Sequence, residues 1–67
     1  MKYKIGDKVE FIDYWTAINT GEIVSLKKKF LWLPNSYLIR YTPYIHVESA
    51  VWIDENDIVK LINTTNK

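Results

Sequence analysis

Short runs of alternating apolar and polar residues recur along this chain at a spacing of roughly 10–15 residues. A period of two is typical of β-strands, because successive side chains of a strand point to opposite faces of the sheet. No window places apolar residues at i, i+3, i+4 and i+7 over three turns, which is the pattern of an amphipathic helix. The alternation therefore predicts an all-β protein.

Five of these runs predict strands, and residues that favour turns separate them. Asn19-Thr20-Gly21 predicts a turn at the end of a loop over residues 14–20, and residues 43–46 form the connection to the fourth strand. Residues 27–33 either extend the second strand or belong to the hairpin that follows it. The predicted strands are residues 9–13, 21–26, 37–42, 47–53 and 58–62.

The last third of the chain carries the clearest local signal. Residues 51–53 and 58–62 are largely apolar, and the four polar residues 54–57 between them have side chains that hydrogen-bond nearby backbone N–H groups and favour turns. We expect a single 3₁₀ turn there, which directs the last strand back across the first. Trp52 is one residue out of phase with its apolar neighbours, so its side chain is expected to point outward.

Five short strands in a chain of 67 residues predict a strongly bent five-stranded barrel, because closure removes the unpaired edges at which sheets aggregate. We expect one domain over residues 1–62 and a frayed polar tail over residues 63–67. A core of this size supplies about 3–5 kcal/mol of net stability, so the ten Phe, Trp and Tyr residues or self-association must compensate. The residues expected to fill the core are Phe11, Ile23, Leu26, Ile39, Val51, Ile53, Ile58 and Leu61.

Composition and charge exclude several classes of protein. Nine basic and eight acidic side chains nearly cancel, which argues against a protein whose whole surface binds nucleic acid. The chain has no cysteine and one histidine, so neither a disulfide framework nor a zinc site is expected. The charged residues near the start predict no signal peptide or membrane span. We expect a cytoplasmic protein without metal, cofactor or membrane association.

The strands and turns together resemble the SH3-like small barrels of KOW and Tudor domains. The resemblance covers nearly the whole chain, and it implies an SH3-like barrel of five strands with one 3₁₀ turn before the last. The basic-Gly pair of KOW domains is absent between Tyr14 and Thr20. The segments that carry the resemblance are residues 3–9, 21–24, 37–41 and 51–57.

Within that group the chain more distantly resembles the plasmid-borne type II dihydrofolate reductases. These are similar in size and share a Gly-Asp-x-Val start, here residues 6–9, and a Gly-x-Ile-Val strand, here residues 21–24. Their Val-Gln-Ile-Tyr segment lines a tetramer pore, and the matching residues here are Val51-Trp52-Ile53-Asp54. A tryptophan and a carboxylate replace the amide and the phenol that recognise folate and nicotinamide. The resemblance therefore carries over the fold and no site, and reductase activity is the third hypothesis.

No arrangement of residues in the sequence indicates catalysis. His46 is the only imidazole, and nothing places a serine beside a base and an orienting acid. Asp54, Glu55 and Asp57 could be paired carboxylates, but turn capping accounts for them and they lack the glycine of a calcium loop. We expect a protein that is not an enzyme.

A run of three lysines supports nucleic-acid binding as the second hypothesis. Lysines contact phosphates, and neighbouring aromatic rings stack on the exposed bases of single strands. The alternative is a solvated hairpin whose lysines guard a strand edge against aggregation. The candidate nucleic-acid-binding residues are Lys27, Lys28, Lys29, Phe30, Arg40 and Tyr41.

Aromatic residues beyond those needed for the core support the first hypothesis, a non-enzymatic module that binds a protein partner or a second copy of itself. Exposed apolar clusters usually mark interfaces. The alternative is that these rings fold over the ends of the barrel as a lid. The composition also suits an accessory protein of a phage or mobile element. The candidate protein-binding residues are Tyr14, Trp15, Leu31, Trp32, Leu33, Tyr44 and Trp52.

Overall fold

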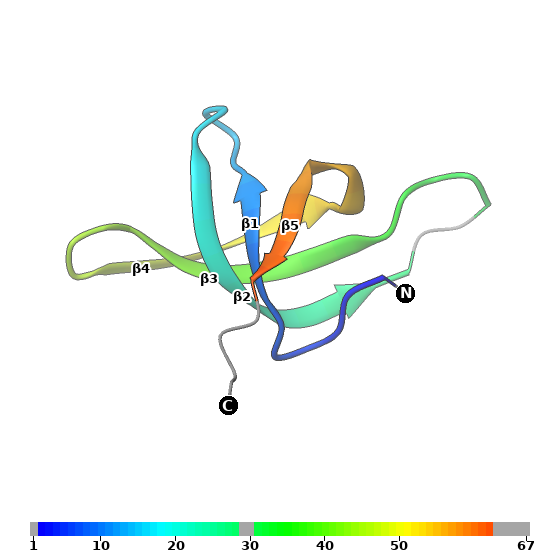
Figure 1. Ribbon diagram of the computed structural model, residues 1–67, viewed down its shortest axis with the longest axis horizontal. Helices are drawn as coiled ribbons and strands as arrows, with labels where there is room; N and C mark the ends of the chain where they lie inside the picture. The colour runs from blue at the N-terminus through cyan, green and yellow to red at the C-terminus, as the bar shows by residue number, and fades with distance from the viewer. Residues whose placement is uncertain (1, 29–30, 63–67) are drawn as a thin grey trace.

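The computed structural model describes residues 2–28 and 31–62, apart from the side chain of Tyr44. In this part of the chain five antiparallel strands form one sheet with the order β4-β3-β2-β1-β5 (Figure 1). The predicted all-β fold, its five strands and the 3₁₀ turn before the last strand are confirmed. The elements are β1 (Lys8–Ile12), β2 (Ile18–Lys27), β3 (Ser36–Tyr44), β4 (Val47–Asp54), the 3₁₀ turn η1 (Glu55–Asp57) and β5 (Ile58–Ile62).

The sheet is bent, but it does not close into the barrel predicted from the sequence. Closure would require β4 to pair with β5, and these two strands are instead the edges of the sheet. The pairing register shifts at three places, between Glu10 and Phe11, between Ile23 and Ser25, and between Tyr41 and Tyr44. Such irregularities bend a strand and increase its twist. They curve the sheet and leave an open side between the two edges.

The second strand is longer than predicted at its start. β2 begins at Ile18, and the turn expected at Asn19-Thr20-Gly21 is not formed, because these residues pair with β1. A Cβ atom on Gly21 would lie 2.5 Å from Cγ2 of Ile39 and 2.8 Å from the carbonyl oxygen of Arg40. The glycine therefore allows β2 and β3 to approach closely and does not mark a turn.

The hairpins also differ from the prediction. β2 ends at Lys27, and residues 31–33 lie in a turn, so the described residues do not extend the strand through Leu33. β3 continues through Pro43, so the connection to β4 consists of Ile45 and His46 alone. Proline is tolerated in β3 because the register shift beside it interrupts the pairing.

The core lies on the concave face of the bent sheet, and most of the predicted core residues are in it. The predicted core omits Tyr3, Val9 and Tyr37, which are all buried. Leu61 is wrongly included, because β5 is an edge strand with a neighbour on one side only and Leu61 remains about half exposed. The eight buried apolar residues are Tyr3, Val9, Phe11, Ile23, Tyr37, Ile39, Ile53 and Ile58, and Leu26, Tyr41 and Val51 pack against them.

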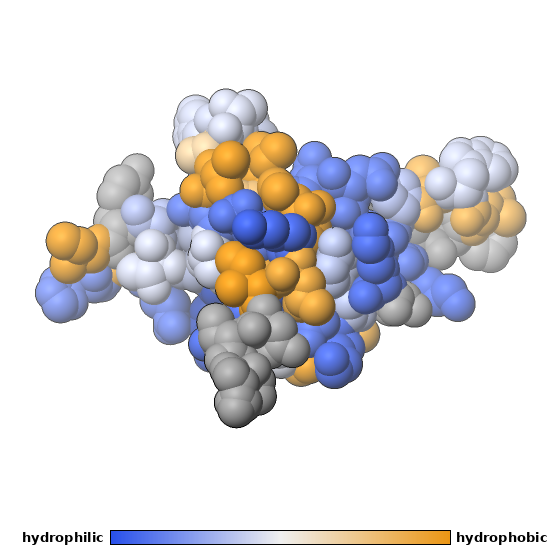
Figure 2. Space-filling model, viewed as in Figure 1, coloured by the Kyte–Doolittle hydropathy of each residue, from blue (hydrophilic) through white to orange (hydrophobic). Residues whose placement is uncertain are grey.

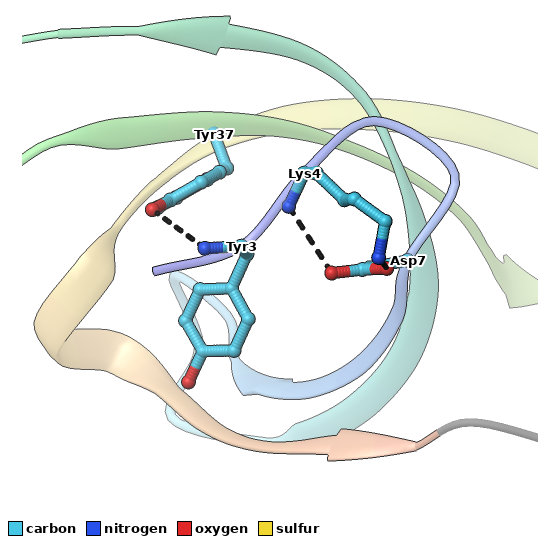
Figure 3. A network of polar contacts seen from close by, with 4 residues as sticks. All are labelled: Tyr3, Lys4, Asp7 and Tyr37. Atoms are coloured by element: carbon cyan, nitrogen blue, oxygen red, sulfur yellow. Dashed lines mark hydrogen bonds and ion pairs between the residues drawn. The ribbon is translucent and has the colours of Figure 1, made fainter. Parts of the chain in front are cut away.

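Tyr37 joins three separate segments of the chain. Its hydroxyl accepts a hydrogen bond from the backbone N–H of Tyr3 at 3.3 Å (Figure 3). The same hydroxyl donates a hydrogen bond to the carboxylate of Glu55. The rings of Tyr3 and Tyr37 pack edge to face with their centroids 5.5 Å apart. We call Tyr3, Tyr37 and Glu55 the tyrosine latch, because it holds the N-terminal arm and the 3₁₀ turn to β3.

The latch changes the acidity of two of its members. Burial, and then the hydrogen bond to Glu55, raises the pKa of Tyr37 to about 12. The hydrogen bond from Tyr37 is the main factor that lowers the pKa of Glu55 below its ordinary value. Both shifts favour a neutral phenol that donates to an ionised carboxylate.

A tight turn connects the latch to β1. The carboxylate of Asp7 accepts a hydrogen bond from the backbone N–H of Lys4 at 3.1 Å and pairs with the Lys4 ammonium group at 3.0 Å (Figure 3). Gly6 has a φ of 99°, which only glycine adopts easily, and its N–H donates to the carbonyl oxygen of Ile23 at 2.8 Å. The segment that precedes β1 is therefore hydrogen-bonded to β2.

Candidate functional site

The turn between β1 and β2 is built around the carboxylate of Asp13. One oxygen accepts from the backbone N–H groups of Trp15 and Ala17, each at 2.9 Å, and the other accepts from the side-chain amide of Asn19 at 2.6 Å. The backbone N–H of Asp13 donates to the carbonyl of Ala17 at 2.9 Å, and that of Thr16 donates to the carbonyl of Asp13 at 3.0 Å. An aspartate that caps its own turn in this way fixes the backbone of residues 13–17.

This turn presents two large aromatic rings to water. Tyr14 is 83% exposed and Trp15 is 78% exposed, and their rings pack edge to face 5.3 Å apart. Thr16 has a φ of 61°, an uncommon conformation for a β-branched residue, and strain of this kind concentrates at functional sites. At this exposure the two rings do not form a lid over the core.

Two adjoining hollows lie between this turn and β4. The hollows have volumes of about 190 Å³ and 520 Å³, and Asp13 lines both. The first is lined by Ile12, Asp13, Tyr14, Val51, Trp52, Ile53, Asp54 and Asp57. The second is lined by Asp13, Trp15, Ala17, Asn19, Tyr41, Pro43, Val47, Glu48 and Ser49. We call the two hollows together the β4 groove, because they follow β4 from one end to the other.

The β4 groove combines apolar and acidic side chains. Its acidic lining residues are Asp13, Glu48, Asp54 and Asp57, and no lysine or arginine is among its described lining residues. Asp54 accepts a hydrogen bond from the hydroxyl of Ser36 at 3.0 Å, and Glu48 lies 3.7 Å from the guanidinium of Arg40. The protein carries a net charge of only +1, so the excess of negative charge is a local property of this groove.

The two edges of the sheet are protected to different degrees. β5 has five residues, with Lys60 at its centre, and short edge strands that carry lysine resist pairing with another chain. β4 has eight residues and contains neither lysine nor proline. One side of β4 pairs with β3, and its other side has no partner strand in the described part of the chain. The β4 groove therefore lies beside the longer and less protected edge.

The other apolar residues predicted for protein binding lie elsewhere. Leu31, Trp32 and Leu33 are exposed in the β2–β3 connection, which projects from the sheet in a different direction from the β1–β2 turn (Figure 1). Trp52 lies on β4 with its side chain half exposed, as its phase predicts, and the Lys27 ammonium group lies 5.2 Å from the centroid of its ring. The side chain of Tyr44 lies outside the described residues. The structure thus brings together Tyr14, Trp15 and Trp52, and it separates them from residues 31–33.

A further apolar area lies over β5, where Val59 and Leu61 are each about half exposed. Figure 2 shows apolar residues gathered around a hydrophilic band on this side of the molecule. Lys60 lies between these two residues in the sequence and is also exposed.

The residues predicted to bind nucleic acid do not form one surface in the described chain. Lys27 and Lys28 are exposed near the β2–β3 connection, and Lys29 and Phe30 lie outside the described residues. Arg40 pairs with Glu22 at 3.3 Å as well as with Glu48. The ring of Tyr41 packs edge to face on Phe11 at 5.1 Å, on the opposite face of β3 from Arg40.

Several residues of the β4 groove could not be found from sequence patterns. The sequence places Asp13 at the end of the first predicted strand and Asp57 in the predicted turn, and it places Val47 and Val51 in the fourth predicted strand. Their common location depends on the bend of the sheet, which brings β4 opposite the β1–β2 turn. The one available signal was Asp13 followed by two aromatic residues, because an aspartate that caps a turn also fixes the direction of the side chains after it.

The described residues contain no helix that is long and apolar enough to cross a membrane. In residues 2–28 and 31–62, no group of three or more His, Asp or Glu side chains is placed to hold a metal ion. No protein-family model, curated protein or solved structure matches this chain.

Proposed function

We propose that this chain is a non-enzymatic module that binds a protein partner at the β4 groove. The observation that carries the proposal is the rigid exposure of Tyr14 and Trp15 at that groove. Exposed aromatic rings of this size are energetically unfavourable in water and are enriched among the residues that dominate the affinity of protein interfaces.

The construction of the β1–β2 turn supports a binding role. The hydrogen bonds to Asp13 fix the backbone on both sides of Trp15 before any partner arrives. A rigid binding surface loses less conformational entropy on association than a flexible one, so more of the contact energy contributes to affinity. A turn whose only role was to connect β1 and β2 would have no need of two exposed rings.

The positions of the candidate nucleophiles and bases support a module without catalytic activity. Ser36 is buried and its hydroxyl donates to Asp54. His46 lies in the two-residue turn between β3 and β4, at the end of the hairpin that projects from the sheet (Figure 1). The hydroxyl of Ser36 is therefore engaged by a carboxylate and not by the imidazole of His46.

Selection of peptides from a random display library against the immobilised protein tests the proposal. We expect the selected peptides to bind wild-type protein and to lose about tenfold or more in affinity for Trp15→Ala, as truncation of an aromatic anchor does at other interfaces. The matched control is Trp32→Ala, which removes an equally exposed tryptophan outside the groove. Peptides that bind both variants equally well, or a library that yields no binder, would contradict the proposal.

Light scattering on the same proteins separates a foreign partner from a second copy. A monomer at the concentrations used for binding supports a foreign partner. A dimer that is lost in Trp15→Ala places the second copy in the β4 groove, whereas a dimer lost only in Trp32→Ala contradicts the assignment of the groove as the binding surface.

A further inference from the structure

We infer that the partner presents a basic, extended segment, which adds to the free edge of β4 as a sixth strand of the sheet. This inference rests on the proposed function and names the chemistry of the partner. Three observations carry it: the edge of β4 that has no partner strand in the described part of the chain, the hollows between β4 and the β1–β2 turn, and the acidic residues among their described lining, which includes no lysine or arginine.

The unpaired edge determines the conformation of the partner. An edge strand presents backbone N–H and C=O groups that an extended chain can pair with, and this mode of recognition is common among peptide-binding domains. β4 has eight residues, which at about 3.3 Å per residue can pair with a segment of six to eight residues or so. β5 is shorter and carries Lys60, so β4 is the edge that accepts the segment.

The charges around the edge determine the composition of the partner. Alternate side chains of an added strand would point towards the first hollow, which Asp54 and Asp57 line. No lysine or arginine is among the described lining residues of the first hollow, whereas Glu48 at the second hollow already lies 3.7 Å from the guanidinium of Arg40. Lysine or arginine side chains of the partner would place their aliphatic stems on Tyr14 and Trp15 and their charges near the carboxylates.

Charge complementarity also distinguishes this partner from other occupants. An acidic segment would be repelled by the carboxylates of Asp54 and Asp57, and like charges brought together at an interface reduce affinity. A helical segment would leave the N–H and C=O groups at the edge of β4 without partners. A basic strand can pair its backbone with the edge of β4 and place its positive charges near the carboxylates.

The probe for a test is an acetylated and amidated heptapeptide in which Lys and Val alternate. We expect it to bind the wild-type protein and to bind less tightly as salt increases, because salt screens the charges around the groove. The same peptide with Glu in place of each Lys is the charge control and should not bind. Equal binding of the Lys and Glu peptides would overturn the inference.

Two N-methylated peptides test the pairing of strands. Methylation of the backbone nitrogen at every Val removes the donors along one edge of the peptide, and methylation at every Lys removes those along the other edge. We expect one of the two methylated peptides to lose binding while the other retains it. If both bind as the parent peptide does, the segment does not pair with β4.

Amide hydrogen exchange locates the new strand. We expect alternate amides of residues 47–54 to exchange more slowly when the heptapeptide is bound, while the amides of β5 do not change. Slower exchange along β5, or no change along β4, would overturn the inference.

Asp57→Asn is expected to weaken binding of the heptapeptide about two- to fivefold, since it removes one exposed charge from the groove. The matched control is Glu10→Gln, which removes one charge on β1 outside both hollows and should leave affinity unchanged. An equal effect of the two variants would contradict recognition of charge by the groove.

The two proposals fail in different ways. If peptides from the library bind through Trp15 but have no basic residues, the module binds proteins and the inference about the partner is wrong. If no peptide binds through Trp15, the proposed function itself is wrong.

Discussion

The tyrosine latch and the β4 groove both place aromatic rings near carboxylates, yet the two regions use these groups differently. In the latch, the ring of Tyr37 is buried and its hydroxyl donates to Glu55. In the groove, the rings of Tyr14 and Trp15 are exposed, and Asp13 bonds the backbone beside them. The comparison shows that the carboxylate supports the fold in both regions. The aromatic ring supports the fold in the latch, where it is buried, and faces water in the groove.

The largest effect expected from this difference is the loss of stability in Tyr37→Ala. Truncation of a fully buried aromatic residue costs about 3–5 kcal/mol, which is similar to the whole net stability expected for a domain of this size. Denaturation with urea, followed by circular dichroism, should show a largely unfolded protein. Tyr37→Phe removes only the hydroxyl and should cost about 1–3 kcal/mol, because Glu55 and the Tyr3 N–H lose their partner. Wild-type stability in Tyr37→Phe would show that the latch does not hold the fold.

Gly21→Ala is expected to have the next largest effect. The new methyl group would overlap Ile39 and the backbone of Arg40, and crowding of this kind costs about 1–3 kcal/mol. Gly6→Ala is a useful comparison, because Gly6 has open space around it and the cost there arises from its φ of 99° alone. Thermal unfolding of both variants measures the two effects separately. A neutral result for Gly21→Ala would contradict the close approach of β2 and β3.

The latch also predicts how stability depends on pH. Because the pKa of Glu55 is lower in the folded protein, its contribution is present above the unfolded pKa of about 4.5 and is lost as pH falls through the lower folded value. Because the pKa of Tyr37 is raised from 10.0 to about 12, its contribution is complete below pH 10 and is lost as pH rises towards 12. Glu55→Gln should lower the free energy of unfolding by about 1 kcal/mol near neutral pH. It should also reduce the loss of stability as pH falls. If stability falls at low pH as steeply in Glu55→Gln as in the wild type, Glu55 does not contribute to the pH dependence.

The smallest effect on stability is expected in Trp15→Ala. Its ring is mostly exposed, and substitutions of exposed residues usually change stability by no more than about 0.5 kcal/mol. The change should nevertheless remove most of the binding of selected peptides. A loss of stability as large as that of Tyr37→Phe would show that Trp15 supports the fold instead of binding a partner.

Much of the fold could be predicted from the sequence, because strand periodicity and turn residues act locally. The polar residues 54–57 correctly predicted the 3₁₀ turn. The alternation of side chains along the strand correctly predicted that Trp52 is exposed. The errors at Gly21 and Pro43 have a common cause. Glycine and proline are both typical of turns, but here both lie within strands. Gly21 has no side chain, which allows β2 and β3 to pack closely. Pro43 lies where the pairing register of β3 shifts.

The β4 groove could be predicted only in part. Tyr14 and Trp15 could be recognised as exposed aromatic residues, but their position opposite β4 could not, because it depends on the bend of the sheet. The failure of the sheet to close has the same origin, since closure depends on how far the register shifts bend each strand. The hydrogen bond between Tyr37 and Glu55 spans 18 residues and has no signature in the sequence.

The most direct test of the central claim is a map of backbone amide chemical shifts, recorded while the labelled protein is titrated with a peptide from the display library. We expect the largest changes at residues 13–17 of the β1–β2 turn and 47–54 of β4, and none at Tyr3 and Tyr37 of the latch. Changes centred on residues 31–33 or on β5, with the β4 groove unaffected, would contradict the claim.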